Sequence, residues 1–209
     1  MSKLTKKSSQ KNYRKLIIYG LSFLMVCGGV YLLTIIRSPI EAPSPEATTK
    51  TIEELTKTRP IIQGERLYIP KLGVDLPIST SQSESDSDEL AVMADNVLNR
   101  KPQNGNPRDG GNYVLAAHRL ELGWTPEQTR AKSPLYNIDK LEVGDEMFVD
   151  YGGVRYRYKV SEYRQVAPTA LEIENRTGMP QITLYSCDLA GYDAGREVVI
   201  AKPAGTVDI

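Results

Sequence analysis

An uncharged apolar run of 21 residues, Leu16–Ile36, is the feature that most restricts how this chain can fold. As an α-helix it would be about 31 Å long, which matches the roughly 30 Å hydrocarbon core of a bilayer. Because backbone groups in lipid must bond one another, a helix is the only single segment that can cross it. A cleaved signal peptide is the competing interpretation, but no convincing small-x-small site follows the run. We therefore predict one N-terminal transmembrane anchor at residues 16–36.

Basic residues gather before this run, with no acidic residue among residues 1–36: Lys3, Lys6, Lys7, Lys11, Arg14 and Lys15. Positive charge marks the cytoplasmic side of a span, so residues 1–15 are predicted to be a basic cytoplasmic tail. Taking these six from the 26 basic residues leaves 20 against 26 acidic ones, a net charge of −6 for the rest. An acidic domain outside the cytoplasm argues against a nucleic-acid partner.

The remainder divides by composition. Residues 37–64 are rich in Pro, Thr and Glu, and we predict an extracytoplasmic stalk there, with a short helix at Ile52–Thr56. Residues 65–209 are enough for one compact domain.

Alternating β-branched and aromatic residues predict a mainly β domain. Two strands around Gly152–Gly153 form a hairpin pattern, and a helical stretch is expected at Asp88–Leu98 and another after Thr125. About eight strands with few helices indicate a closed or nearly closed β-barrel. Strands are expected at Leu67–Ile69, Val74–Ile78, Asn112–Ala117, Glu146–Tyr151, Val154–Val166, Gln181–Cys187 and Val198–Ala201, with a loop at Asp188–Gly195.

The candidate catalytic residues are Cys187, His118 and Arg196. If Cys27 lies in the membrane, Cys187 is a lone thiol outside the cytoplasm, where lone thiols are unusual. A thiol attacks as thiolate, an imidazole can move the protons, and a guanidinium can stabilise an oxyanion. His118, the one histidine, and Arg196 supply the imidazole and the guanidinium. The alternative interpretation of Cys187 is a buried cysteine of the hydrophobic core. One His and one Cys make a poor metal-ligand set, so no metal site is predicted.

Four further residues are candidates for substrate binding: Thr183, Ser186, Asp188 and Trp124. Thr183 shares a strand face with Cys187, and Asp188 follows the thiol, where it could orient His118 or Arg196. Structural roles compete for three of them: strand packing for Thr183, a turn for Asp188, and packing under a loop for Trp124.

An acidic loop at Ser79–Glu89 could bind a calcium ion. Carboxylates at Glu84, Asp86, Asp88 and Glu89 offer the oxygen ligands that calcium prefers. They lack the spacing of a defined calcium loop, which favours a solvated loop. We predict no cofactor.

The chain also resembles the sortase family. TLYSC at 183–187 with Arg196 nine residues later is similar to the family's Thr-Leu-x-Thr-Cys…Arg signature. AAHR at 116–119, IPKLGVDLPI at 69–78 and LEVGD at 141–145 resemble further family patterns, in the family's order, across residues 65–203. Ser186 stands where Thr is usual and Ala117 where Gly is common, and neither change removes a reacting group.

This resemblance implies an eight-stranded barrel and a membrane-bound transpeptidase of a Gram-positive-type bacterium. Cys187 would attack the Thr carbonyl of a Leu-Pro-x-Thr-Gly-like sorting signal on a surface protein. His118 would protonate the departing Gly amine, and Arg196 would hold the substrate or its oxyanion. A peptidoglycan precursor or a pilin lysine would accept the acyl group. Residues 38–66 lack the Asp-Pro-aromatic lid motif common in pilin-joining members, which favours surface anchoring.

Two alternatives remain open at this point. A cysteine peptidase would use the same site but release the acyl group to water. A non-enzymatic, membrane-anchored β-barrel could instead bind a wall polymer, with Cys187 as a core residue.

Overall fold

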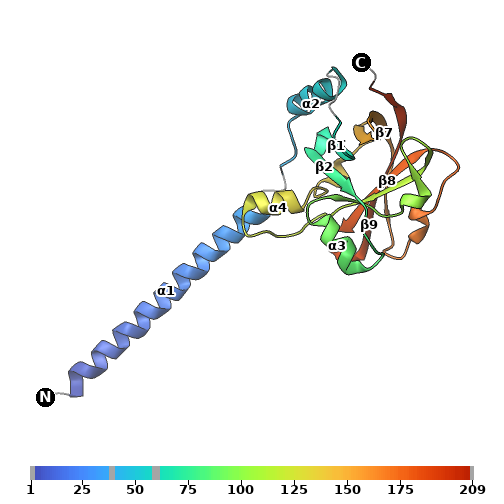
Figure 1. Cartoon of the computed structure of the whole chain (residues 1–209). Coiled ribbons are helices and arrows are strands. Elements are labelled where there is room, and N and C mark those ends of the chain that lie inside the picture. Colours follow the sequence, from blue (N-terminus) through green and yellow to red (C-terminus); the bar gives the residue numbers. More distant parts are fainter. Residues whose placement is uncertain (1–2, 38–40, 58–61, 208–209) are drawn as a thin grey trace.

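The computed structural model describes residues 3–37, 41–57 and 62–207. A long helix, α1 (Lys3–Arg37), extends away from a β-barrel formed by the carboxy-terminal two thirds of the chain (Figure 1). Its segment Tyr13–Ile35 has a mean hydropathy of 2.2 and is long and apolar enough to cross a membrane. This segment contains nearly all of the run predicted as an anchor.

The barrel has eight strands: β1 (Arg66–Ile69), β2 (Val74–Ser79), β3 (Val97–Asn99), β5 (Gly110–Ala116), β6 (Glu146–Tyr151), β7 (Val154–Val166), β8 (Gln181–Asp188) and β9 (Gly191–Thr206). Their order is β3-β2-β1-β6-β7-β9-β8-β5, and pairing of β3 with β5 closes the ring. A two-residue strand, β4 (Gly105–Asn106), pairs with β5. The predicted closed, mainly β barrel is confirmed.

The hairpin of β6 and β7 follows directly from its sequence. Tyr151 pairs with Val154, so Gly152 and Gly153 form a two-residue turn. Their φ angles of 55° and 84° are those of the primed turns that match strand twist, and glycine adopts them without steric cost.

Alternation along β8 divides the core in two. Ile182 and Leu184 face the barrel interior, where they pack with strands from around the ring. Tyr185 faces outward into a second buried cluster. Since successive residues of a strand point to opposite faces, Cys187 shares the outer face with Tyr185.

Short helices connect the strands: η2 (Pro70–Leu72), α3 (Asp86–Met93), η3 (Pro102–Asn104), α4 (Pro126–Lys132), η4 (Ile138–Lys140) and η5 (Leu171–Glu174). Helix α4 begins after Thr125, as predicted, and the Thr125 side chain accepts a hydrogen bond from Gln128 N. The helix expected over Asp88–Leu98 was placed too far along, because α3 ends at Met93 and Val97–Leu98 belong to β3.

The prediction of a loop at Asp188–Gly195 is wrong. Strand β9 already begins at Gly191, which pairs with Asp188 across a tight turn. Glycines at 191 and 195 have φ of 119° and 149°, so the glycines that suggested a loop instead carry the irregular start of a strand.

Part of the expected stalk is folded onto the barrel. Helix α2 (Pro45–Lys57) is longer than the predicted Ile52–Thr56 and lies beside the barrel (Figure 1). It contacts η2. Arg155 Nη1 donates to the Leu55 carbonyl at 3.3 Å. Residues 38–40 and 58–61 of that predicted stalk lie outside the described residues.

Candidate active site

Cys187 and Arg196 are direct cross-strand partners. Antiparallel pairing of β8 with β9 sets them opposite each other. Opposite residues of an antiparallel pair project on the same face. Cys187 is a free thiol, and both residues are partly exposed. A cation is therefore held beside the only extracytoplasmic thiol of the predicted topology.

The strand on the other side of β8 leads to His118. β5 runs parallel to β8 with Ala116 level with Tyr185, and Ala117 N donates to the Tyr185 carbonyl at 3.3 Å. His118 follows Ala116 by two residues, and Cys187 follows Tyr185 by two residues. The ends of β5 and β8 and the start of β9 thus bring all three predicted catalytic residues to one end of three adjacent strands.

His118 has a charged partner that the sequence did not reveal. Its Nε2 lies 3.1 Å from Glu121 Oε2, and Glu121 Oε1 lies 2.6 Å from Lys132 Nζ. Burial of the ring lowers the pKa of His118, Glu121 partly opposes this, and Lys132 adds to it. A lowered pKa favours the neutral form of the ring, and the Glu121 carboxylate holds its orientation. A neutral imidazole can accept a proton from a thiol.

A buried ion pair lies beneath the site. Arg119 Nη1 is 2.5 Å from Glu197 Oε1, and Arg119 Nη2 is 2.9 Å from Asp139 Oδ1. The Tyr163 hydroxyl donates a hydrogen bond to Glu197, and burial, followed by this bond, raises the pKa of Tyr163. The structure buries Arg119, so this ion pair connects the residue that follows His118 to the residue that follows Arg196.

The two residues that precede Cys187 on the same face of β8, Thr183 and Tyr185, are held by buried hydrogen bonds. Thr183 is fully buried and donates to Asn112 Oδ1 at 2.6 Å. Tyr185 donates to Glu174 Oε1 at 2.5 Å, and Arg100 Nε also binds that oxygen. Thr183 has no exposed surface through which it could make the expected substrate contact.

The other substrate-binding candidates differ in exposure. Ser186 is buried on the opposite face from Cys187, and its hydroxyl donates to the Cys187 carbonyl at 3.3 Å. Asp188 Oδ1 accepts from Ala190 N at 2.7 Å, which is the turn role. Trp124 is not packed under a loop but is 85% exposed. Of these residues, only Asp188 adjoins the thiol with exposed surface.

Three carboxylates of the acidic loop are bound by other side chains of the protein. Glu84 pairs with Lys101 at 2.9 Å, Asp88 accepts from Ser83, and buried Glu89 pairs with Arg100. Within residues 3–37, 41–57 and 62–207, no three His, Cys, Asp or Glu side chains gather as metal ligands would. The carboxylates diverge toward separate partners.

A cavity of about 440 Å³ lies away from this site. It is lined by Glu41 and Pro43 before α2, by the η2–β2 connection and by α4. None of Cys187, His118 and Arg196 lines it.

Two residues of the site were missed from sequence. Glu121 follows His118 by three positions, a spacing that could have suggested a partner. Glu197 is a charge at the start of the apolar strand VVIA, and a charge there signals a buried pair.

Comparison with known proteins agrees with this arrangement of strands. The family model described as "Sortase domain" matches residues 67–204. Sortase A of Bacillus anthracis is 26% identical over 144 residues, which are 68% of this chain and 60% of that protein. The chain thus spans less than two thirds of the length of that relative.

Solved structures show the same fold. Sortase A of Listeria monocytogenes matches with a TM-score of 0.54 and 19% identity, over 68% of this chain and 87% of that one. The sortase D5 transpeptidase of Clostridium perfringens matches with a TM-score of 0.54 and 23% identity, over 85% and 99%. Sortase E1 of Streptomyces coelicolor, solved with a tripeptide in its active site, matches with 0.55 and 23%, over 69% and 90%.

The fold and the matched domain define a class: membrane-anchored cysteine transpeptidases that attach surface proteins or join pilins. This chain belongs to the sortase family.

Proposed function

We propose that this sortase cleaves a Leu-Pro-x-Thr-Gly-like sorting signal after Thr and transfers the acyl group to an amine, anchoring surface proteins to the cell wall. Cys187 attacks the Thr carbonyl, forming a thioester as the Thr–Gly bond breaks. His118 takes the proton of the thiol and gives it to the departing Gly amine, then takes a proton from the incoming amine and returns it to the thiolate as the thioester breaks. Arg196 binds the oxygen that becomes negative during both steps.

The pairing of Cys187 with Arg196 is the observation that carries this proposal. A guanidinium stays charged at all relevant pH values and forms strong hydrogen bonds to an oxyanion. The parallel neighbour β5 ends just before His118, so thiol, cation and imidazole belong to three adjacent strands. A core cysteine would not need either partner.

The position of α2 supports anchoring over pilin joining. Leu55 of α2 binds Arg155 at the start of β7, whereas Val166 at the other end of β7 pairs with Arg196. Eleven residues of strand separate these points, about 35 Å in extended chain. Among the described residues before the barrel, α2 therefore lies far from Cys187 and does not act as a lid over it.

The charges around α1 support a single-pass orientation in the cell membrane. Six basic residues precede the apolar run, and the positive-inside rule assigns them to the cytoplasm. The barrel then works on the outer surface, where the amine acceptor is a peptidoglycan precursor. A pilin lysine is the alternative acceptor. No cofactor is required by this mechanism.

The test is mass spectrometry of the full chain in detergent with a Leu-Pro-x-Thr-Gly peptide library and an amine. We expect a thioester adduct on Cys187 that the amine converts into a new peptide bond. Cys27→Ala is the matched control and should form the adduct, whereas Cys187→Ala should not. Only hydrolysed product would identify a peptidase. An unreactive Cys187 thiol would favour the non-enzymatic barrel.

A further inference from the structure

The segment after His118 exposes a row of apolar side chains. Leu120, Leu122 and Trp124 are 40%, 52% and 85% exposed, and they alternate with Glu121 and Gly123. An indole has a large apolar surface, and leaving it in water forgoes a substantial transfer free energy. Apolar side chains exposed side by side mark an interaction surface more often than a single exposed leucine does.

The backbone of this segment is fixed, so the exposure of Trp124 is built in. Trp124 N donates to Gln128 Oε1 and Gly123 N to Thr129 Oγ1, both at 2.9 Å. Thr129 is fully buried. The first turn of α4 therefore holds the indole away from the barrel.

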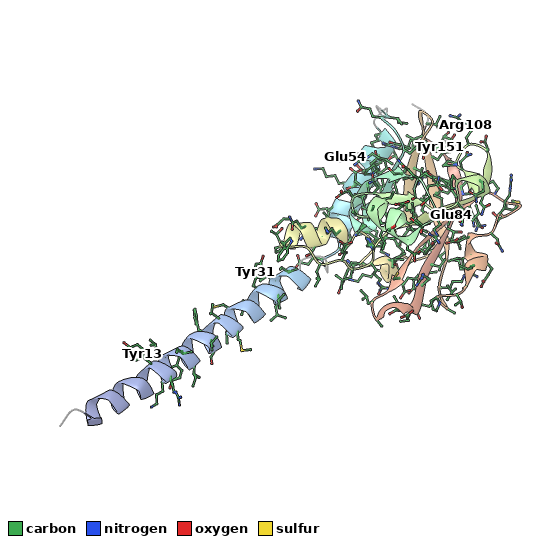
Figure 2. The ribbon with its side chains drawn as sticks, turned by 60° about the horizontal axis from the view of Figure 1, so that its bottom comes forward. Tyr13, Tyr31, Glu54, Glu84, Arg108 and Tyr151 are labelled. Atoms are coloured by element: carbon green, nitrogen blue, oxygen red, sulfur yellow. The ribbon has the colours of Figure 1, made fainter. Side chains whose placement is uncertain are left out.

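The same segment touches the end of α1 nearest the barrel. The Tyr31 hydroxyl donates to the Trp124 carbonyl, and α1 contacts α4. Tyr31 lies where α1 reaches the barrel, whereas Tyr13 lies toward the other end of the helix (Figure 2). Tyr31 precedes Ile35, the last residue of the apolar window, by four residues, or about 6 Å along the helix. That is the depth at which Trp and Tyr gather in membrane proteins.

We propose that Leu120, Leu122 and Trp124 insert into the lipid–water interface of the membrane that α1 crosses. This inference rests on α1 being a membrane span, because the span sets the depth of Tyr31 and thereby of Trp124. Lipid buries the apolar row, while the polar edge of the indole stays at headgroup level.

Docking of this kind would set the candidate site at the membrane surface. Glu121 lies between Leu120 and Leu122 in sequence, and its carboxylate is 3.1 Å from His118 Nε2. Contact of Leu120 and Leu122 with lipid would therefore fix the orientation of Glu121, the charged partner of His118. Substrates held in the same membrane by their own anchors would be favoured over freely diffusing proteins.

The single tryptophan of the chain makes the test direct. The full chain is reconstituted in phosphatidylcholine vesicles, with or without bromines at the headgroup end of the acyl chains, and tryptophan emission is recorded. Most of the Trp124 emission should be lost in the brominated vesicles, and aqueous acrylamide should quench it weakly. The matched reporter is Trp124→Phe combined with Leu171→Trp, at a 67% exposed position on η5. Its emission should be insensitive to bromine and strongly quenched by acrylamide.

A charge in the apolar row gives an independent readout. Leu122→Glu should reduce quenching of Trp124 by brominated lipid, and Leu171→Glu should leave it unchanged. Flotation of the same vesicles on a density gradient reports only whether α1 anchors the protein in the bilayer. Trp124 emission that matches the Leu171→Trp reporter in floated protein would overturn the docking proposal while leaving the anchor intact. Failure to float would overturn the anchor and the docking together. Neither result depends on transpeptidase activity.

Discussion

Arg119 and Glu197 form a buried ion pair, and each is the chain neighbour of a proposed catalytic residue: Arg119 follows His118, and Glu197 follows Arg196. Their side chains lie 2.5 Å apart at the closest atoms. Because β8 lies between β9, which holds Glu197, and β5, which leads to Arg119, this pair directly connects segments that are not neighbours in the sheet. The relative position of His118 and Arg196 therefore depends on a contact that neither residue makes itself.

Breaking this pair should destabilise the barrel. Arg119→Met leaves the buried Glu197 carboxylate without its cation, and we expect a loss of about 3 kcal/mol in the free energy of unfolding. Urea denaturation measures it. The double variant Arg119→Met/Glu197→Leu removes both charges and should recover most of the loss, since an apolar replacement of a buried pair is often tolerated. An additive double variant would contradict the direct coupling.

The pKa of His118 should respond with opposite signs to its two charged neighbours. Burial lowers it below 6.5, Glu121 raises it in part and Lys132 lowers it. Glu121→Gln should therefore lower the pKa further, and Lys132→Met should raise it. The chain has one histidine, so its imidazole signal in an untagged protein gives an unambiguous NMR titration. Shifts of the same sign in both variants would show that neither charge acts on the ring directly.

The same shift predicts a pH dependence of stability. With a pKa below 6.5 in the folded chain, His118 binds protons more readily when the chain is unfolded. Its contribution to stability should be fully present above pH 6.5 and should fall as the pH drops from there toward the folded pKa. His118→Gln should flatten the pH profile of the unfolding free energy in that window. A profile unchanged by the substitution would contradict the lowered pKa.

Docking of α2 should depend on Arg155. Its Nε and Nη2 bind both oxygens of Asp150, at 2.7 and 2.8 Å, while Nη1 reaches the Leu55 carbonyl. Arg155→Lys keeps the charge but cannot form this two-pronged contact. We expect faster hydrogen exchange across Pro45–Lys57. Arg157→Lys, on the same strand and paired with Glu146, is the control and should leave exchange in α2 unchanged.

Gly123 should be intolerant of a side chain. A Cβ there would lie 2.4 Å from Gln128 Cβ and 2.8 Å from Thr129 N, so the loop or α4 must move. Gly123→Ala should cost about 2 kcal/mol of stability. A Cβ at Gly178 would meet none of the described residues within 4 Å, so Gly178→Ala should leave the melting temperature unchanged. Equal melting temperatures for the two variants would show that the close approach at Gly123 is absent in solution.

Much of the fold could be predicted from local pattern. The period-two alternation of β6 and β7 and the Gly152–Gly153 turn depend on neighbouring residues, and their bounds were predicted to the residue. The start of β9 was not, because Gly191 and Asp193 resemble a loop until their pairing with β8 is known. Similarly, Val97 and Leu98 continue a helical pattern but form a strand by pairing with β2 and β5.

The sequence by itself determined the long apolar helix, the strand alternation and the presence of one histidine and one thiol outside that helix, because each can be recognised from the sequence without knowing the contacts of the folded chain. Only the tertiary structure decided which residues surround them. The Arg119–Glu197 pair, the burial of Thr183 by Asn112 and the contact of Tyr31 with Trp124 join residues more than 70 positions apart. Such contacts arise from strand order and barrel closure, which depend on the free energy of the whole packed core and not on any local pattern.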